Sequence, residues 1–274
     1  MSAQLRLQVM ICTFGAEGIR RVAAGCYPRV EGVEYLVSWQ MPDGEADMPR
    51  ELAERDDFRI ARSATRGLGL NRKLCLAAAT APLVLAADDD LRYTPEGLLG
   101  VIEAFDSRPK RDLLTFRYAT DGKEKRYPDA ECDLREAPRN YYVSSVEIAF
   151  RREAALRAGV DFNPWFGVAS LFPSGEDALF VEEAMRKGLS CAFVPATVCF
   201  HPGDSTGIRR RNDPAFIEAK AAIISHIHPI DWPLRMAAHA MREAGGEGRL
   251  SRMAYVRAWL SGVAKARRRR VFDR

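Results

Sequence analysis

The first 110 residues alternate short apolar segments with amphipathic ones, and this alternation constrains the fold more than any other feature of the chain. Strand-like and helix-like segments in alternation predict a parallel β-sheet whose strands are joined by crossover helices. Strands are expected over Leu5–Cys12, Val33–Trp39, Phe58–Ala61 and Leu83–Ala87, and helices over Glu17–Ala24 and Asn71–Ala79. The expected class is therefore an α/β fold with a mostly parallel sheet flanked by helices.

Three consecutive aspartates, Asp88, Asp89 and Asp90, directly follow a short, fully apolar strand candidate. A Thr-Pro pair then caps a helix that is expected over residues 95–105. Ligands of open α/β sheets bind beyond the carboxyl ends of the strands, which is where these carboxylates should lie. A divalent cation would relieve their mutual repulsion, and oxygen ligands suit Mg²⁺ or Mn²⁺. The alternative is a solvated acidic loop at the start of the next helix.

Beyond residue 110 two more strands are expected, over Leu113–Ala119 and Val143–Phe150. They lie on either side of a charged insertion, Thr120–Asn140. An insertion of this length is either a surface excursion or a lid over a bound acceptor substrate.

Two later features are candidates for chemistry. The Ser-Gly-Glu-Asp sequence at residues 174–177 opens a helix that Gly188 closes, and its spacing is that of a capping box. Asp177 is therefore either a helix cap or a general base that faces a cleft. A strand expected over residues 191–194 and an apolar stretch ending at Phe200 lead to His201, which is either a structural residue or a metal ligand.

Two further groups of residues are ambiguous. Arg66, Arg72 and Lys73 flank a glycine turn at a helix start, where they could hold a diphosphate or form a solvated face. Trp165 and Phe166 could form an aromatic platform for the sugar ring of an acceptor, or pack in the core.

The composition is that of a globular protein, with 47% hydrophobic, 28% charged and 9% aromatic residues among 274. No apolar run approaches the roughly 20 residues that a membrane span needs, and the N-terminus does not resemble a signal peptide. The six cysteines form no CxxC pair, which argues against zinc and for a reducing cytoplasm.

The charge is divided unevenly along the chain. Residues 205–274 hold 15 Lys and Arg against 6 Asp and Glu, a net +9, whereas the first 204 residues carry −5. An amphipathic stripe runs through this basic tail, formed by Leu250, Met253, Ala254, Val256, Trp259, Leu260 and Val263. The segment 246–274 could lie on an anionic membrane surface, where lipid-linked acceptors reside, or pack on the body or in a homodimer contact.

Taken together, these pieces resemble glycosyltransferase family 2, the inverting enzymes of the Rossmann-like GT-A fold. The segment RGLGLNRKLCLAAATAPLVLAADDDLRYTPEGL resembles that family's helix, buried strand, Asp-x-Asp motif and proline-started helix. The segment FNPWFGVASLFPSGEDALFVEEAMRKGLSCAFVPATVCFH resembles its acceptor-side region, in which a Gly-Glu-Asp motif opens a helix and a later strand ends in histidine. The resemblance covers roughly residues 5–205.

The resemblance implies a role for each matching residue on the donor side. Asp88 and Asp89 would contact the ribose and diphosphate of the donor. Asp90 would bind Mn²⁺ or Mg²⁺, in a site that includes Asp88 and that His201 completes. Arg72 matches a basic position of the donor site.

On the acceptor side the resemblance implies that Asp177 is the general base and that Glu176 helps to orient the acceptor. Asp177 would take the proton of the acceptor hydroxyl as it attacks the anomeric carbon from the face opposite the leaving diphosphate. The anomeric centre would thereby be inverted.

The chain departs from the family pattern at two strand ends. The first strand ends in Cys-Thr-Phe-Gly at residues 12–15 where the family usually has Pro-Thr-Tyr-Asn. The second ends in Ser-Trp-Gln at residues 38–40 where the family usually has acidic residues. Thr13, Trp39 and Gln40 are the donor contacts expected at these places, with Trp39 or Gln40 against the base. UDP is implied by the family and not by these residues.

The expected protein is a metal-dependent inverting glycosyltransferase of the cytoplasm or the inner face of the membrane. It would transfer a sugar from a UDP-sugar to a glycan or lipid-linked acceptor in bacterial cell-surface polysaccharide synthesis. Residues 1–204 would form the catalytic domain, with a donor half to about residue 110 and an acceptor half over about 111–204, and residues 205–274 a helical basic extension. The alternatives are a sugar-phosphate nucleotidyltransferase and a non-catalytic nucleic-acid binder that uses the basic tail. The acidic body disfavours nucleic acid.

Overall fold

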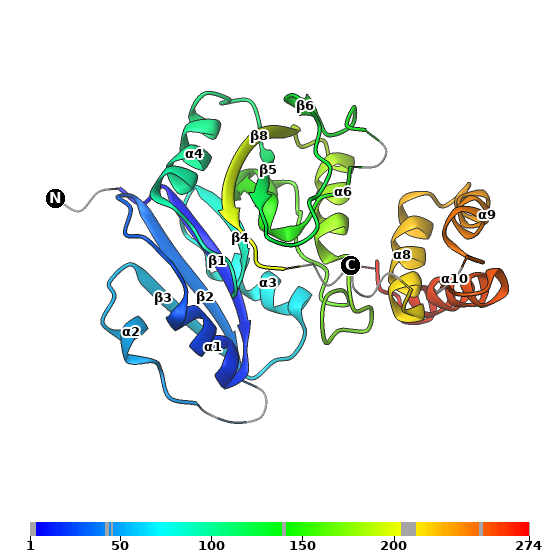
Figure 1. Cartoon of the computed structure of the whole chain (residues 1–274), viewed down its shortest axis with the longest axis horizontal. Helices are drawn as coiled ribbons and strands as arrows, with labels where there is room; N and C mark the ends of the chain where they lie inside the picture. Colours follow the sequence, from blue (N-terminus) through cyan, green and yellow to red (C-terminus); the bar gives the residue numbers. More distant parts are fainter. Residues whose placement is uncertain are drawn as a thin grey trace.

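A computed structural model gives the structure of the chain (Figure 1) and describes residues 4–41, 44, 46–138, 141–203, 212–246 and 249–273. Its strands are β1 (Leu7–Phe14), β2 (Val33–Gln40), β3 (Phe58–Ser63), β4 (Leu83–Asp88), β5 (Leu113–Ala119), β6 (Cys132–Asp133), β7 (Ile148–Arg151) and β8 (Cys191–Phe200). Around them lie α1 (Gly15–Ala24), α2 (Arg50–Ala53), α3 (Leu68–Ala78), α4 (Pro95–Asp106), α5 (Arg152–Arg157) and α6 (Glu176–Arg186). A short 3₁₀ helix, η1 (Ser145–Glu147), precedes β7.

The strands form one sheet in the order β3-β2-β1-β4-β7-β5-β8-β6. The pairs β1–β2, β1–β4, β2–β3 and β5–β8 are parallel, whereas β7 runs antiparallel to both β4 and β5, and β6 antiparallel to β8. Six strands therefore end at the same edge of the sheet, and β7 begins there. The predicted α/β class with a mixed, mostly parallel GT-A-like sheet is confirmed.

Both faces of the sheet are covered, which explains why the central strands are apolar without alternation. In β1, Val9 and Ile11 pack on one face with apolar side chains of α1 and α4. Met10 and Cys12 pack on the other face with side chains of α3 and α6. These helices hold the strand ends in fixed positions, so the edge of the sheet is a rigid platform for loops.

The strand predicted over Val143–Phe150 differs from the structure. Its first half is the 3₁₀ turn η1, and β7 begins only at Ile148. The turn forms because Glu147 accepts a hydrogen bond from the backbone N–H of Ser144 at 3.2 Å, a capping interaction that an extended strand cannot make.

The insertion predicted as a surface excursion or a lid runs largely along the surface over its described residues, 120–138, but parts of it are anchored in the body. It contributes β6, which pairs with β8, and it sends the Lys125 side chain into the interior with no exposed surface. Buried polar contacts of Lys125 and Tyr127 with Glu147 hold this segment against the body, and the charged composition of the segment did not indicate them.

The C-terminal part is a bundle of α8 (Pro214–Ile227), α9 (Trp232–Glu243) and α10 (Arg252–Arg268), which lies to one side of the sheet (Figure 1). Trp259 and Val263 of the predicted amphipathic stripe are buried in a cluster with Ile217 and Ala221 of α8. A Cβ on Gly262 would lie 2.2 Å from the Glu218 carbonyl oxygen, so this glycine lets α10 approach α8 closely.

The bundle also packs on the body. Ala219, Ala222 and Ile223 of α8 share a buried cluster with Phe166 and Leu179. Of the two alternatives for the stripe, membrane contact and packing, the structure shows packing for Trp259 and Val263, whereas Met253 and Leu260 are exposed. None of the helices in the described part of the chain combines the length and the hydropathy needed to cross a lipid bilayer.

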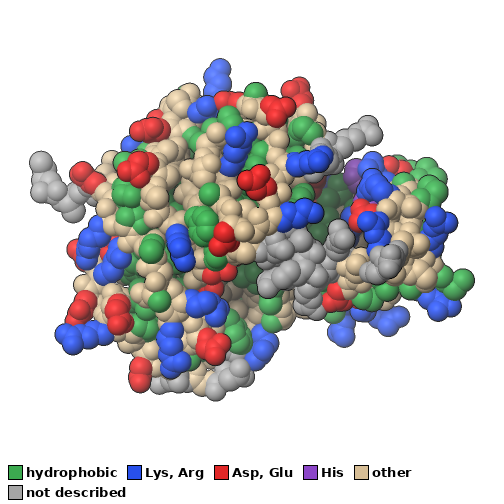
Figure 2. All heavy atoms as spheres, viewed as in Figure 1, with side chains coloured by type: hydrophobic (Ala, Val, Ile, Leu, Met, Phe, Trp, Pro, Cys, Tyr) green, Lys and Arg blue, Asp and Glu red, His purple; other side chains and the backbone are tan. Residues whose placement is uncertain are grey.

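Apolar side chains remain exposed elsewhere on the bundle, where Figure 2 shows hydrophobic patches beside Lys and Arg side chains. Ile230, Leu234 and Met241 are 93%, 75% and 67% exposed, at helical spacing before and along α9. On α10, Met253 and Leu260 are 66% and 48% exposed.

Candidate functional site

A cavity of about 630 Å³ lies at the edge of the sheet where the parallel strands end. Thr13 and Phe14 at the end of β1, Gln40 at the end of β2 and the three aspartates after β4 line one side. The other side is formed by Arg66, Leu68, Asn71, Val168, Ala169 and residues 201–203. The position is the one at which an open α/β sheet binds ligands.

Asp89 is held firmly at the base of α1. Its carboxylate accepts hydrogen bonds from the Thr13 hydroxyl at 2.5 Å and from the Arg21 guanidinium at 3.0 and 3.1 Å. A Cβ on Gly18 would lie 2.2 Å from the Thr13 hydroxyl oxygen and 3.0 Å from the Asp89 carboxylate. Only glycine allows α1 to press against this pair, so the site's geometry is set partly by the helix sequence.

Arg72 is the centre of charge of the site. The side chain is 1% exposed, and its guanidinium lies 2.8 Å from Asp88 and 3.4 Å from Glu176, with Asp177 as a third ion-pair partner. Burial alone would lower the pKa of Arg72, but the charges of Asp88 and Glu176 raise it above its ordinary value. The arginine therefore stays charged and joins carboxylates from β4 and α6.

Glu176 is the most deeply buried of these carboxylates, with 5% of its surface exposed. Burial raises its pKa, and the charge of Arg72 opposes that shift. Its partner is Arg72, so in this structure it supports the arginine.

Asp90 is the most exposed of the three consecutive aspartates. Partial burial and the charge of Asp88 raise its pKa, whereas His201 lowers it. The buried Nδ1 atom of His201 has no hydrogen-bond partner among the described residues. The chemistry of these donors fits a Mg²⁺ or Mn²⁺ ion, since carboxylate oxygens and an available imidazole nitrogen are suitable ligands.

A smaller cavity of about 250 Å³ adjoins the first, and the two share Leu68, Asp88, Val168 and His201 as lining residues. Asp177 lines the smaller cavity at the start of α6, and its second carboxylate oxygen accepts a hydrogen bond from the backbone N–H of Ser145 at 3.1 Å. The rim includes Tyr118, Tyr142, Pro173 and Phe216, of which Phe216 comes from α8. Asp177 therefore faces a separate compartment next to the cavity of the three aspartates.

Most predicted site residues come together at these cavities. Thr13, Gln40, Asp88, Asp89, Asp90 and His201 line the larger one, and Arg72, Glu176 and Asp177 line the smaller one. Arg72, predicted as a donor contact, is buried beneath three carboxylates instead. Arg66 lies over the ring of Phe14, whereas Lys73 pairs with Asp161 outside both cavities.

Three predicted aromatic contacts lie elsewhere. Trp39 is fully buried, and its indole N–H donates to the Gly15 carbonyl oxygen at 2.9 Å, so it has no free face for a base. Phe166 is also fully buried and stacks on Phe172 with 4.9 Å between ring centres. Trp165 is 38% exposed but lines neither cavity. Core packing, the alternative weighed for Trp165 and Phe166, is the correct description of Phe166.

The sequence-based prediction omitted Arg21, Ser145, Tyr142 and Phe216. The Ser144-to-Glu147 spacing was a usable signal for the turn that presents Ser145, because it is a capping-box spacing. Nothing in the local sequence indicated that Arg21, Tyr142 or Phe216 would reach the site, since their positions depend on how distant elements pack.

Residues 40–162 match the model of the glycosyl transferase family 2. The chain carries a glycosyltransferase family 2 domain. This match runs from the last residue of β2 to beyond α5 and includes the three aspartates. It confirms the predicted family and the prediction that the protein is a glycosyltransferase. It favours that activity over nucleotidyl transfer. No curated protein sequence matches the chain significantly.

Solved structures of Staphylococcus aureus (S. aureus) TarS have a similar fold. TarS 1–349 is 15% identical with a TM-score of 0.61, covering 96% of this chain and 92% of that one. Its complex with UDP-GlcNAc is 16% identical with a TM-score of 0.63, and the match covers 95% of this chain and 80% of that one. Its complex with UDP is 16% identical with a TM-score of 0.59, and the match covers 97% of this chain and 82% of that one. In a longer TarS structure the chain spans 43% of that protein.

We expect Arg72→Met to destabilise the family 2 domain by about 3–5 kcal/mol at pH 7, because it leaves buried carboxylates without their cation. Burial holds the pKa of Glu176 above its unfolded value, so the stability that protonated Glu176 provides is lost as the pH rises. The destabilisation caused by Arg72→Met should therefore be smaller at pH 5, where more of Glu176 is protonated and needs no cation, than at pH 7. Urea unfolding at the two pH values measures it.

The matched control is Lys73→Met on the same helix, whose ion pair with Asp161 is partly exposed and should contribute less than about 1 kcal/mol. Equal losses for the two variants, or a loss at Arg72 that does not depend on pH, would contradict a central role for Arg72.

Proposed function

We propose that the protein transfers a sugar from a nucleoside diphosphate donor to a hydroxyl group of an acceptor, with inversion at the anomeric carbon. The observation that carries this proposal is the pair of adjoining cavities. The larger holds Asp88, Asp89 and Asp90, and the smaller holds Asp177, with Asp88 and His201 at their junction. The family 2 match and the UDP-GlcNAc and UDP complexes of TarS support a nucleotide sugar as the donor.

The donor's nucleoside would occupy the part of the larger cavity formed by the ends of β1 and β2. Phe14 is 39% exposed there, with the Arg66 guanidinium 5.0 Å from its ring centre, and takes the place proposed for Trp39 as the aromatic partner of the base. Gln40 lines the same cavity, although its side-chain amide already donates to Thr65 at 2.8 Å and to the Gly67 carbonyl at 3.2 Å. UDP is the proposed nucleotide.

Asp90, with Asp88 and His201, would hold a Mn²⁺ or Mg²⁺ ion. When bound, such an ion supplies Lewis-acid stabilisation of the negative charge on a leaving diphosphate. Within the described part of the chain, no group of three or more His, Cys, Asp and Glu side chains forms a metal-binding set by itself. The donor's diphosphate oxygens would therefore have to complete the coordination, so the ion and the nucleotide would bind together.

Asp177 would act as the general base. The Arg72 guanidinium binds one oxygen of this carboxylate, and the Ser145 N–H donates to the other. An acceptor hydroxyl in the smaller cavity would transfer its proton to this carboxylate as it attacks the anomeric carbon. The acceptor side and the donor side meet at Asp88, which allows attack from the face opposite the diphosphate.

The acceptor is proposed to be a glycan or a lipid-linked sugar, as in the assembly of a cell-surface polysaccharide. Tyr142 is 51% exposed at the rim of the smaller cavity and presents a ring on which an acceptor sugar could stack. Tyr118 and Phe216 extend the same rim. These residues replace Trp165 and Phe166 as the proposed aromatic platform.

Asp177→Asn tests the base assignment. Transfer should fall by at least about 100-fold, because the amide cannot accept the proton, while the UDP dissociation constant measured by calorimetry should stay unchanged. Trp165→Ala is the control, since this side chain lines neither cavity and should leave both quantities unchanged. An Asp177→Asn enzyme with normal turnover, or one that has lost UDP binding equally, would disprove the assignment.

We further propose that the bundle contacts an anionic membrane surface through α9 rather than through the stripe of α10. Leu234 and Met241 are exposed on α9, and residues 205–274 carry a net charge of +9, which complements acidic lipid head groups. Deletion of residues 246–274 is not a suitable test, because it would remove α10 from its packing against α8.

The double variant Leu234→Glu/Met241→Glu should lose most of the co-sedimentation of the protein with phosphatidylglycerol vesicles. Its matched control is Leu99→Glu/Leu156→Glu, which changes two leucines on the body that are 42% and 43% exposed. Equal sedimentation of wild type and the α9 variant would rule out this surface. A loss of mass in solution without vesicles would show that the face is a dimer contact instead.

A further inference from the structure

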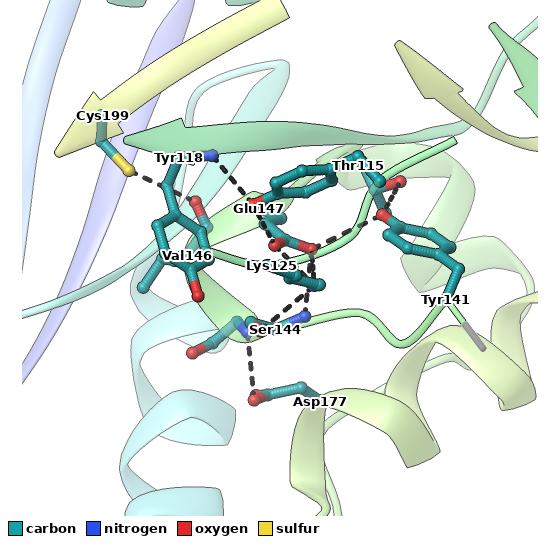
Figure 3. A network of polar contacts seen from close by, with 11 residues as sticks. Thr115, Tyr118, Lys125, Tyr141, Ser144, Val146, Glu147, Asp177 and Cys199 are labelled. Carbon is teal, nitrogen blue, oxygen red and sulfur yellow. Dashed lines mark hydrogen bonds and ion pairs between the residues drawn. The ribbon is translucent and has the colours of Figure 1, made fainter. Parts of the chain in front are cut away.

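Beneath the smaller cavity lies a buried ion pair between the 120–138 segment and the turn η1. The side chains of Lys125 and Glu147 are both 0% exposed, and the Lys125 Nζ lies 2.6 and 2.7 Å from the two oxygens of Glu147 (Figure 3). Neither residue lines either of the two cavities described above. The pair therefore does not contact substrate, and its presence next to the site requires another explanation.

Stability alone is a weak explanation for this pair. Burial lowers the pKa of Lys125 and raises the pKa of Glu147, so each charge is costly to bury, although the attraction between them offsets part of that cost. Buried ion pairs can often be replaced by apolar side chains of similar volume with no loss of stability. The position of the pair suggests that it fixes geometry.

The carboxylate of Glu147 is the centre of a hydrogen-bond network that Figure 3 shows. One oxygen accepts from the Tyr127 hydroxyl at 2.9 Å, and the other accepts from the Ser144 backbone N–H at 3.2 Å. Tyr127 in turn accepts from the backbone N–H of Tyr118 on β5 at 3.1 Å. The backbone at Ser144 is thus tied, through Glu147, to the interior of the sheet.

The next residue carries this constraint to the site. The Ser145 backbone N–H donates to Asp177 at 3.1 Å, and its hydroxyl lies 3.4 Å from Asp88. Arg72 binds the other oxygen of Asp177, so the two oxygens have separate anchors. Without Ser145, the carboxylate could rotate about its bond to Cβ and turn both oxygens towards Arg72, away from the cavity.

We propose that the Lys125–Glu147 pair is a positioning device that holds the Ser145 N–H against Asp177 and so fixes the plane of the base carboxylate. The inference rests on the proposed role of Asp177 as the general base. In this account the 120–138 segment, which carries Lys125 and Tyr127, acts on catalysis from below the turn and not as a lid over the acceptor.

The test uses two double variants, because Lys125→Met alone would leave Glu147 charged and buried without a partner. Lys125→Met/Glu147→Leu removes the charges and the acceptor for the Ser144 N–H. Lys125→Met/Glu147→Gln also removes both charges but keeps a carbonyl oxygen that can accept from that N–H. The first should lower kcat about tenfold or more through misplacement of the base, and the second should retain kcat within about threefold.

In the Leu-containing variant, the acceptor KM and the UDP dissociation constant should change less than about twofold, because neither residue touches substrate. Hydrogen exchange of the Ser145 amide should become faster in this variant and stay slow in the Gln-containing one. Faster exchange with an unchanged kcat would overturn the positioning role, as would equal kcat values in the two double variants.

Adding Asp177→Asn to the Leu-containing variant separates this inference from the proposed function. If Asp177 is the base and the pair acts through it, the triple variant should be no slower than Asp177→Asn alone. A further tenfold loss would show that the pair acts by another route. If Asp177→Asn alone transfers sugar normally, the base assignment fails, whereas the exchange rate of the Ser145 amide still reports whether the pair holds the turn.

Discussion

The charge of one buried arginine determines how the carboxylates of this protein are arranged. Arg72 lies on α3 with only 1% of its side chain exposed, so its attraction to the nearby carboxylates is screened less than that of a surface pair. Its guanidinium joins Asp88, which lines both cavities, to Asp177, which lines the smaller one. Two carboxylates that would otherwise repel each other can therefore stand close together, Asp88 at the junction of the two cavities and Asp177 in the smaller one.

The sheet supplies the geometry in which that arginine works. Because β1, β2 and β4 are parallel neighbours, Thr13, Gln40 and Asp88 end at one edge and can face one ligand. The antiparallel β7 brings the turn η1 to the same edge, next to α6. Strand direction as well as charge thus brings the two cavities together. The α8 helix adds Phe216 to the lining of the smaller cavity, so the C-terminal bundle contributes to the cavity wall.

Much of this could be predicted from the sequence because it depends on local patterns. The buried strand, the aspartates after it and the Thr-Pro helix start are contiguous, so Asp88–Asp90 were correctly placed at a strand end. The family was recognised from the same contiguous blocks. The division at residues 110 and 204 stays a prediction.

Other features depend on tertiary packing and were not predictable in this way. Trp39 looked like a partner for a base because it ends a strand, but its side chain enters the core and donates to Gly15. Arg72 looked like a phosphate ligand because it is basic and follows a glycine turn. In the structure it instead forms ion pairs with Glu176 and Asp177, which are more than 100 residues away in the sequence. The membrane stripe on α10 was a real amphipathic pattern, and the partner it buries against is α8.

The central claim is that the carboxylates after β4 bind a nucleoside diphosphate together with a divalent cation. Calorimetric titration of UDP into the protein, in Mn²⁺ and again in a chelator, tests it most directly. The account predicts binding that is about tenfold tighter or more in Mn²⁺, and the loss of this difference in Asp90→Asn. UDP that binds equally well with and without the cation would contradict it.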